Sequence, residues 1–500
     1  MNGQDKDLTT GSADSGTNQD KEVCLVVAGS VDSGKSSFIG VITSDELDDG
    51  RGSARAKVAK HPHEVREGKT SDISSKTIVY GDKKLTLVDL CGHEKYLKTT
   101  LFGMTGFFPD YGILIVSANR GLLKMTKEHM GILIYLNIPF IILVTRVDIT
   151  PKNIYDDVIN VTGKLLKKYK RTPEFVNGSA EFELMNDGDT TKLKEREIEG
   201  KDKIEKSVKK LKTNPFIVPI LSISNKTGYY IDVVKHMLTK LEPRKVWNSE
   251  SVNGSIFYID SKFIPEGIGL VVSGLTKGKP ININSEMLIG PYGNEFRRVR
   301  VWSMHNNSKE NVTVLNDRQR GCLAIKGKEK DDVTKANIRK GMIVISKELE
   351  QNVCYQFTAD IEILTHSTVI SPKYTPVIHC GTVRQSAKIV LTDGQALKMG
   401  DKAEVSFRFV QYPEFMEVGE KFFFREGTTR GVGEIKSILA LKDDPDPKPA
   451  QPKRLKYHKR QRRGPRTQNP ASAGVTVQPT NPLNNKRFNK KINKTNIVVI

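Results

Sequence analysis

The chain has 500 residues and a formal net charge of +21, and 37% of its residues are hydrophobic. This length exceeds one ordinary domain and the apolar content can fill several cores, which excludes a disordered chain, a collagen-like repeat and a coiled-coil rod. No run of about 18 apolar residues is present to cross a membrane, the first twenty residues lack a signal-peptide pattern, and the five cysteines never form Cys-x-x-Cys. We therefore expect a monomeric cytoplasmic protein of about three domains, with no membrane partner, disulfide framework or zinc site.

The first half of the chain alternates between strand and helix patterns. Residues 1–21 are polar and are expected to be disordered, and the alternating pattern then covers residues 22–245. It indicates βαβ units, and hence a mostly parallel sheet with helices on both faces. The highly charged stretch 172–212 is expected to be a solvated, partly helical insertion on the surface of this domain. The expected strands are 23–28, 84–88, 112–116, 140–144 and 216–221.

After residue 246, short β-branched runs with Gly and Asn turns replace the helical period. This pattern is typical of small antiparallel barrels, and a break near residues 347–352 divides it into domains 246–348 and 349–443. Residues 444–500 hold 14 basic residues against two Asp and are expected to form a disordered basic tail. The eleven expected strands are 255–259, 269–273, 286–289, 296–304, 342–346, 358–363, 377–379, 386–391, 403–409, 421–424 and 431–441.

A phosphate-binding loop follows the first expected strand. The sequence there is Gly29-Ser30-Val31-Asp32-Ser33-Gly34-Lys35-Ser36, and a helix is expected from Ser37. In this setting backbone N–H groups can face the α- and β-phosphates of a nucleotide, and the helix dipole adds to the attraction. Lys35 can reach the β- and γ-phosphates, and the Ser36 hydroxyl can ligate Mg²⁺. We expect a nucleotide site here rather than a glycine turn with an incidental Lys-Ser pair.

A second motif, Asp89-Leu90-Cys91-Gly92-His93, follows the second expected strand. Asp89 can hold Mg²⁺ through water, the Gly92 N–H can bond the γ-phosphate, and His93 can position the attacking water. Taken alone, Asp-x-x-Gly is a weak signal and a His after a strand is more often structural. The order and spacing behind a phosphate loop favour the catalytic interpretation.

Two further motifs predict recognition of guanine. Thr145-Arg146-Val147-Asp148 ends the fourth expected strand, where the Asp148 carboxylate can accept bonds from guanine N1–H and the exocyclic amine. Ser224-Asn225-Lys226 follows the fifth strand, where backbone N–H groups can meet the guanine carbonyl. Either motif alone is a surface loop by default, but four motifs in order at strand ends indicate a GTP site.

The segment 66–73 lies between the first two motifs and contains Thr70. A threonine there can join Mg²⁺ and the γ-phosphate, which gives a loop ordered by GTP and released by GDP. From spacing alone, an inert polar loop is an equal alternative.

The combined motifs resemble translational GTPases of the elongation factor Tu and elongation factor 1-alpha class, and look most like the GTP-binding protein one/two group within it. The resemblance extends over about residues 22–443. Both tails and the charged insertion lie outside it. The stretches that carry it, besides the phosphate loop, are 68–71, 89–100, 103–106, 125–129, 223–228, 267–274, 379–387 and 424–430.

This resemblance implies an α/β P-loop GTPase domain followed by two antiparallel β-barrels, with GTP or GDP and Mg²⁺ as cofactors. It implies GTP hydrolysis on the ribosome, with tRNA or another RNA as partner. The implied roles are phosphate and Mg²⁺ binding for Lys35 and Ser36, γ-phosphate sensing for Thr70, the second switch for Asp89 and Gly92, water positioning for His93, guanine reading for Asp148 and Ser224, and a monovalent-cation contact for Asp32.

Three departures from the class pattern are present. Ser30 stands where the class has His. Thr145-Arg146 replaces the usual Asn-Lys, and this change puts the affinity for the nucleotide in question but not the preference for guanine. Lys69 precedes Thr70 where elongation factor Tu has an apolar gate residue facing the equivalent of Val31. We therefore expect slow intrinsic hydrolysis, with His93 less restrained or gated by Ile73, and required for stimulated turnover.

The segment 453–463 holds seven basic residues and His458. Such a cluster predicts salt-sensitive, sequence-blind RNA binding, with a nuclear-localisation-like or solubility tail as an equal alternative. Two other functions stay open: a GTP-loaded RNA or protein tether with incidental hydrolysis, and a GTPase subunit that regulates sulfate activation. The Asn- and Lys-rich bias suggests an AT-rich genome, such as that of a large virus acting in its host's cytoplasm.

Overall fold

The computed structural model describes residues 21–446, apart from 60–69, 71, 82, 245–251, 328–332, 366–369, 371–373, 391–395 and 428. Three predictions concern residues outside this set: the disordered N-terminal tail, of which only Lys21 is described, most of segment 66–73, including Lys69, and nearly all of the basic tail, including 453–463. In the described part of the chain, no helix is long and apolar enough to cross a membrane.

The first domain is built on a seven-stranded sheet in the order β2-β3-β1-β4-β5-β7-β6. All neighbouring strands are parallel except β2 and β3. Its central strands are continuous apolar runs, as expected of parallel strands covered on both faces. The strands are β1 (Lys21–Gly29), β2 (Ser74–Tyr80), β3 (Lys83–Asp89), β4 (Tyr111–Ser117), β5 (Phe140–Thr145), β6 (Thr172–Phe175) and β7 (Ile217–Ser222).

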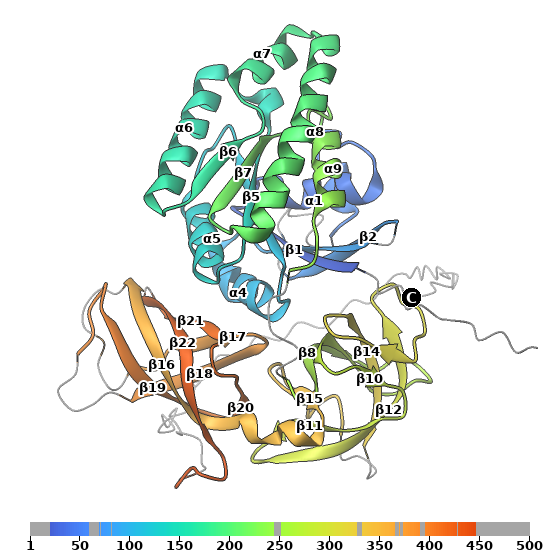
Figure 1. Cartoon of the computed structure of the whole chain (residues 1–500), viewed down its shortest axis with the longest axis vertical. Helices are drawn as coiled ribbons and strands as arrows, with labels where there is room; N and C mark the ends of the chain where they lie inside the picture. Colours follow the sequence, from blue (N-terminus) through green and yellow to red (C-terminus); the bar gives the residue numbers. More distant parts are fainter. Residues whose placement is uncertain are drawn as a thin grey trace, which may run out of the picture. The chain divides into compact units, whose positions relative to one another are not determined.

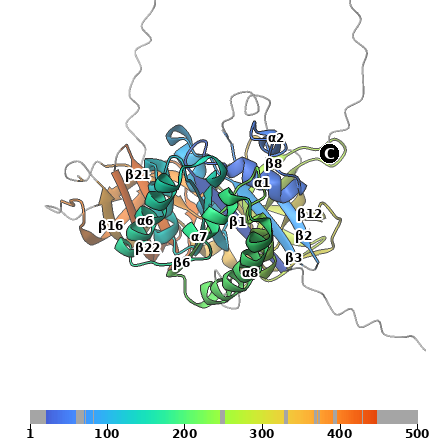
Figure 2. The same cartoon turned by 90° about the horizontal axis from the view of Figure 1, so that it is seen from above.

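Helices cover both faces of this sheet. Figure 1 shows α5 and α6 on one side and α1, α8 and α9 on the other. The short α2 packs beside α1 (Figure 2). The helices are α1 (Lys35–Ser44), α2 (Ser53–Ala56), α4 (Leu97–Gly106), α5 (Lys124–Tyr135), α6 (Lys152–Lys168), α7 (Ser179–Asp187), α8 (Thr190–Thr213) and α9 (Ile231–Lys240), with 3-10 turns η1 (Glu94–Tyr96) and η2 (Val147–Ile149).

The charged stretch 172–212 differs from the surface insertion expected from its composition. Its first residues form β6, an edge strand that pairs with β7. The helix α8 is charged on one side, but it buries Ile204, Val208 and Leu211 in the domain core. Its Lys and Glu residues therefore mark only the solvated face of an amphipathic helix that is part of the domain.

The second sheet is a closed six-stranded barrel in the order β11-β12-β14-β9-β8-β15. All eleven strands expected after residue 246 are present, but the prediction missed β14 and the two-residue strands β10, β13 and β20; the residues of β14 are buried almost continuously instead of alternating. The barrel strands are β8 (Ser255–Phe263), β9 (Val271–Gly278), β11 (Glu286–Tyr292), β12 (Glu295–Asn306), β14 (Arg320–Gly327) and β15 (Ile343–Ile345), beside the short pair β10 (Ile281–Asn282) and β13 (Val314–Leu315).

The third sheet closes through pairing of β16 with β19, and the short β20 (Glu414–Phe415) extends it. Its interior is dominated by phenylalanine: Phe357 and Phe407 stack with ring centroids 5.4 Å apart, and Phe422 meets both edge-on. The expected mostly parallel sheet covered by helices, followed by two antiparallel barrels, is thus confirmed. The strands are β16 (Val353–Thr365), β17 (Val377–Cys380), β18 (Val383–Val390), β19 (Lys402–Phe409), β21 (Lys421–Glu426) and β22 (Thr429–Ala440).

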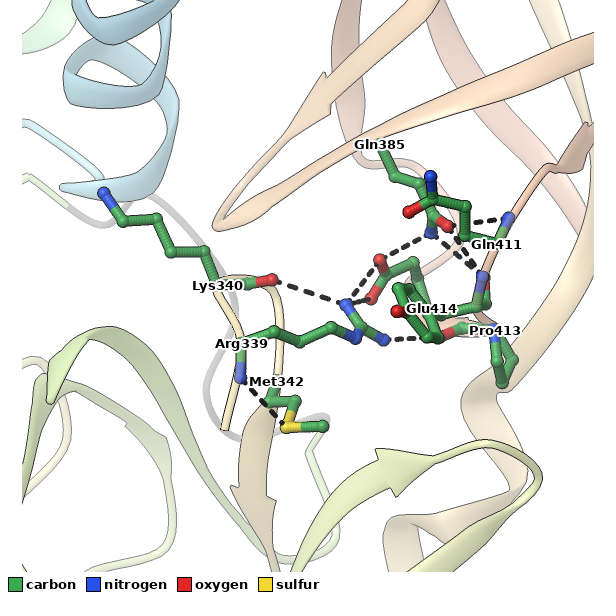
Figure 3. A network of polar contacts seen from close by, with 8 residues as sticks. Arg339, Lys340, Met342, Gln385, Gln411, Pro413 and Glu414 are labelled. Atoms are coloured by element: carbon green, nitrogen blue, oxygen red, sulfur yellow. Dashed lines mark hydrogen bonds and ion pairs between the residues drawn. The ribbon is translucent and has the colours of Figure 1, made fainter. Parts of the chain in front are cut away.

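A buried polar network links the loop before β15 to β20 (Figure 3). The Arg339 guanidinium donates to both carboxylate oxygens of Glu414, at 2.7 and 2.8 Å, and to the carbonyl of Pro413 at 2.9 Å. The Gln385 amide donates to the same carboxylate at 2.7 Å. Burial raises the pKa of Glu414 to about 7, although the charge of Arg339 and the two hydrogen bonds work in the opposite direction.

Candidate functional site

The predicted phosphate loop connects β1 to α1, which begins at Lys35, two residues earlier than expected. Gly29 has a φ of 144°, and a β-carbon there would lie 2.5 Å from the carbonyl oxygen of Ile115. Gly34 and Asp32 also have positive φ angles, of 93° and 58°. The loop therefore turns sharply, and its sequence is constrained by backbone conformation as well as by any ligand.

The Lys35 side chain is buried at the centre of this loop. Its Nζ donates to the carbonyl oxygen of Ser30 at 2.7 Å. Burial lowers the pKa of Lys35, and the nearby Asp89 carboxylate partly offsets this effect. An anionic phosphate placed beside the ammonium group would favour its charged form, so the site fits a nucleotide phosphate.

Three hydroxyl and carboxylate groups meet next to Lys35. The Ser36 Oγ donates to the Asp89 Oδ2 at 2.6 Å and lies 3.2 Å from the Thr70 Oγ1, which is itself 3.4 Å from Asp89 Oδ2. These side chains come from α1, from the segment before β2 and from the end of β3. Hard oxygen donors gathered in this way fit Mg²⁺, so the structure brings together the three residues expected to hold the metal.

The segment after β3 closes over the phosphate loop. Gly92 lies so near that a β-carbon would be 2.6 Å from both Lys35 Nζ and the Val31 backbone nitrogen. His93 is exposed, and its Nδ1 accepts a hydrogen bond from the Lys95 N–H at 3.1 Å. A cavity forms between these elements and takes in most of the expected phosphate-site residues. It is lined by Val31, Asp32, Gly34, Lys35, Ser36, Ser37, Arg55, Thr70, Gly92, His93 and Arg146.

The residues expected to read guanine lie together at the ends of β5 and β7. The Ser224 Oγ donates to the Asp148 Oδ1 at 2.7 Å and accepts from the backbone N–H groups of Lys226 and Thr227. The amide oxygen of Asn225 is buried and has no hydrogen-bond partner among the residues that the structure describes. The bond from Ser224 orients the Asp148 carboxylate, and the Asn225 amide oxygen remains available to accept a hydrogen bond from a polar base.

Thr145 and Arg146, which depart from the class pattern, both reach the phosphate loop. The Thr145 Oγ1 donates to the Ser33 carbonyl at 2.7 Å and thus ties the loop that contains Asp148 to the phosphate loop. Arg146 has a φ of 62° and lines the phosphate cavity. Thr145 therefore has a structural function that the sequence alone did not suggest.

The replacement of His by Ser30 also has a structural counterpart. The Ser30 Oγ lies 2.8 Å from the Thr126 Oγ1 and accepts from the Thr126 N–H at 3.1 Å, which joins the phosphate loop to the start of α5. One turn later, the buried His129 accepts the Gly29 N–H at 3.0 Å through Nδ1. Burial lowers the pKa of His129 to about 3, so this ring is neutral and can accept that bond.

Arg55 and Arg120 were not foreseen from the sequence. Arg55 of α2 lines the same cavity as Lys35. Arg120 lies 3.7 Å from the Asp32 carboxylate, so a guanidinium faces the group expected to contact a monovalent cation. No sequence motif predicts either arginine, because each reaches the site through the packing of a separate segment.

Comparisons with known proteins agree with this geometry. Residues 20–244 match the elongation factor Tu GTP binding domain, and residues 350–439 match the elongation factor Tu C-terminal domain. The chain is 34% identical to GTP-binding protein 1 of Xenopus laevis, over 93% of this chain and 71% of that protein. It is 31% identical to GTP-binding protein 2 of Mus musculus, over 83% and 69%. Elongation factor 1-alpha of Methanobrevibacter smithii is 23% identical, over 82% and 90%.

Solved structures show the same fold. A bacterial selenocysteine-specific elongation factor superposes with a TM-score of 0.59 at 18% identity, over 84% of this chain and 58% of that one. The elongation factor SelB of Methanococcus maripaludis, in complex with the GTP analogue GppNHp, gives 0.59 at 19% identity, over 85% and 80%.

The expected likeness to GTP-binding proteins 1 and 2 is confirmed, whereas the suggestion of a viral source finds no support among these relatives. The first domain binds GTP and GDP and hydrolyses GTP. The chain belongs to the family of GTP-binding protein 1 and GTP-binding protein 2, within the elongation factor Tu class of GTPases.

Proposed function

We propose that this GTPase acts on the ribosome, together with tRNA or another RNA, and that hydrolysis ends its action there. The single observation that supports the assignment of the active centre is the convergence of Ser36, Thr70 and Asp89 within 3.4 Å beside the buried Lys35. The relatives named as elongation factors support the translational setting.

In this proposal each residue has one task in phosphoryl transfer. Water attacks the γ-phosphorus while the bond to the β-phosphate oxygen breaks, which yields GDP and phosphate. Lys35 and the loop amides hold the β- and γ-phosphates, and His93 positions the water. Mg²⁺, held by Ser36, Thr70 and Asp89, would neutralise charge on the β- and γ-phosphate oxygens.

The other residues of the site select the nucleotide and respond to it. Asp148, oriented by Ser224, accepts from guanine N1–H and the exocyclic amine, and adenine offers no such pair of donors. Gly92 and Thr70 contact the γ-phosphate and so report whether GTP or GDP is bound. The exposed position of His93 suits a side chain that an external surface, such as the ribosome, moves into place.

A multiple-turnover assay of the full chain tests the proposal. GTP hydrolysis should be slow alone, at least tenfold faster with ribosomes and tRNA, and lost in His93→Ala under the stimulated condition, while ATP should not be hydrolysed. Equal, slow turnover with and without ribosomes, combined with GTP-dependent retention of RNA, would favour the tether function instead. Stimulation by a metabolic enzyme, and not by ribosomes, would favour a regulatory subunit.

A further inference from the structure

The outer face of the first barrel presents an indole beside two arginines. Arg298, Arg300 and Trp302 alternate along β12 with the buried Val299 and Val301. Because alternate side chains of a strand point to one face, all three lie on the outside of the barrel. Trp302 is 39% exposed.

These side chains line a cavity of about 420 Å³ that is separate from the nucleotide site. Lys326 of β14 lies opposite Arg300 in the strand register and adds a third cation, and Glu286 of β11 adds one carboxylate. Asn284 adds an amide to the lining. The volume falls in the range of small-molecule sites and accommodates one nucleotide.

Among the described residues, the cationic side chains and the indole of this cavity have no partner in an ion pair or a ring contact. In that part of the chain, Arg298, Arg300 and Lys326 form no ion pair, and no ring or guanidinium covers Trp302. Arg297, one residue away, provides a contrast, because its guanidinium lies 4.1 Å from the centre of the Tyr292 ring. A flat apolar surface with three cations against one carboxylate, and hence a net positive charge, matches a ligand that has a π face and negative charge.

We propose that this cavity binds an unpaired nucleotide of single-stranded RNA, whose base stacks on Trp302 while the flanking phosphates contact Arg298, Arg300 and Lys326. A base inside a duplex is already stacked on both faces, so only an unpaired base can cover a recessed indole. Two arginines and a lysine can follow successive phosphates, which a neutral peptide cannot match. This inference rests on the proposed function, which names RNA as a partner, and it identifies the surface that the RNA contacts.

Fluorescence of Trp302 provides a direct test. The sequence has two tryptophans, so Trp247→Phe in the full chain makes Trp302 the only one. A 12-nucleotide oligouridylate, added at about 0.3 M salt to weaken purely electrostatic binding elsewhere, should quench this fluorescence saturably, and a blunt 12-base-pair RNA duplex should not.

Variants of the full chain give a second readout. In anisotropy titrations with labelled oligouridylate, Trp302→Ala should weaken binding about tenfold, and Trp302→Phe should retain most of it. The pair Arg298→Ala with Arg300→Ala should weaken binding about tenfold and reduce its salt dependence. Tyr169→Ala at the end of α6, where the ring is 43% exposed, and Lys388→Ala on β18 serve as matched controls and should change little.

Three outcomes would overturn the inference: no quenching of Trp302, equal quenching by the duplex, or equal RNA affinity of Trp302→Ala and the unmodified chain. GTP binding by Trp302→Ala separates this inference from the proposed function. Normal quenching in a chain that does not bind GTP contradicts only the nucleotide assignment, whereas normal GTP turnover without quenching contradicts only the RNA site.

Discussion

Gly92 lies directly against Lys35: a β-carbon on Gly92 would be 2.6 Å from the lysine Nζ, and equally close to backbone atoms of Ser30 and Val31. Two segments that are far apart in the sequence thus meet with no room for a side chain. We therefore expect the contact that we propose between Gly92 and the γ-phosphate to depend on this close approach.

We expect Gly92→Ala to push the segment after β3 away from the phosphate loop. Because a displacement of about 1 Å costs about 100-fold in rate, kcat/KM for GTP should fall by about that factor. Turnover and fluorescent-GTP binding measure the effect. Gly131→Ala is the matched control, since a β-carbon on this α5 residue meets nothing within 4 Å. An unchanged kcat/KM in Gly92→Ala would contradict the expectation.

Arg55 should contribute to catalysis although no motif predicted it. Arg55 lines the phosphate cavity and is held there by α2. This helix packs tightly on α1, since a β-carbon on Gly40 of α1 would be 2.1 Å from the Ala54 carbonyl oxygen of α2. Charge-assisted bonds to phosphate are worth about 1.5–3 kcal/mol, so Arg55→Ala should lower kcat/KM about 10- to 100-fold. Arg51→Ala, an exposed neighbour, is the control. If kcat/KM fell equally in both variants, the effect would come from the net positive charge near the site and not from a contact made by Arg55.

The strands of the sheet interior were predictable because each is a short apolar run. The edge strands β2 and β6 were missed because β2 is mostly exposed and β6 contains Pro173, which an edge tolerates. The charged composition of α8 predicts a solvated insertion, because composition does not reveal the helical spacing of the residues that α8 buries.

The site could be predicted wherever its residues follow a strand in a short motif. Ser36 and Asp89 follow strands and meet as their motifs predict, whereas Thr70 precedes β2 and its spacing alone left an inert loop equally open. The bond from Ser30 to Thr126 joins residues 96 positions apart. Contacts of this kind, like the position of Arg55, depend on tertiary packing and leave no periodic or local pattern to read.

Asp148→Asn should change the nucleotide preference. The carboxylate accepts two bonds from guanine, and an amide can instead donate to the C2 carbonyl of xanthine. Leaving buried donors unpaired is costly, so GTP affinity should fall about 1,000-fold or more while XTP affinity rises. Competition binding with both nucleotides measures this. The Asp148→Asn protein should retain its fold, which circular dichroism checks, and undiminished preference for GTP would exclude Asp148 from base recognition.

The buried Glu414 should make stability depend on pH. Its pKa is about 7 in the folded chain against an ordinary value of 4.5, so between these values the folded state binds the extra proton. Stability then falls as pH rises from about 4.5 to 7, with a slope of up to about 1.4 kcal/mol per pH unit from this group.

Glu414→Gln should remove this slope, and thermal unfolding at several pH values from 5 to 8 compares the two chains. The Tm of the variant should vary less with pH, and above about pH 7 the variant should also lack the ionised partner that Glu414 gives Arg339. Parallel Tm curves for the two chains would show that Glu414 does not titrate in this range.

Thr70 should set the metal requirement. Its hydroxyl lies 3.2 Å from Ser36 Oγ and 3.4 Å from Asp89 Oδ2, so Thr70→Val removes one of three gathered oxygens while keeping the side-chain shape. We expect the Mg²⁺ concentration that gives half-maximal GTP hydrolysis to rise about 10- to 100-fold, and chelation of the metal to abolish turnover in both proteins. Thr43→Val on α1 is the matched control, because among the residues that the structure describes the Thr43 hydroxyl donates only to the Gly40 carbonyl of its own helix. If Thr70→Val and Thr43→Val show the same Mg²⁺ dependence as the unmodified chain, Thr70 does not hold the metal, and its nearness to Asp89 is structural.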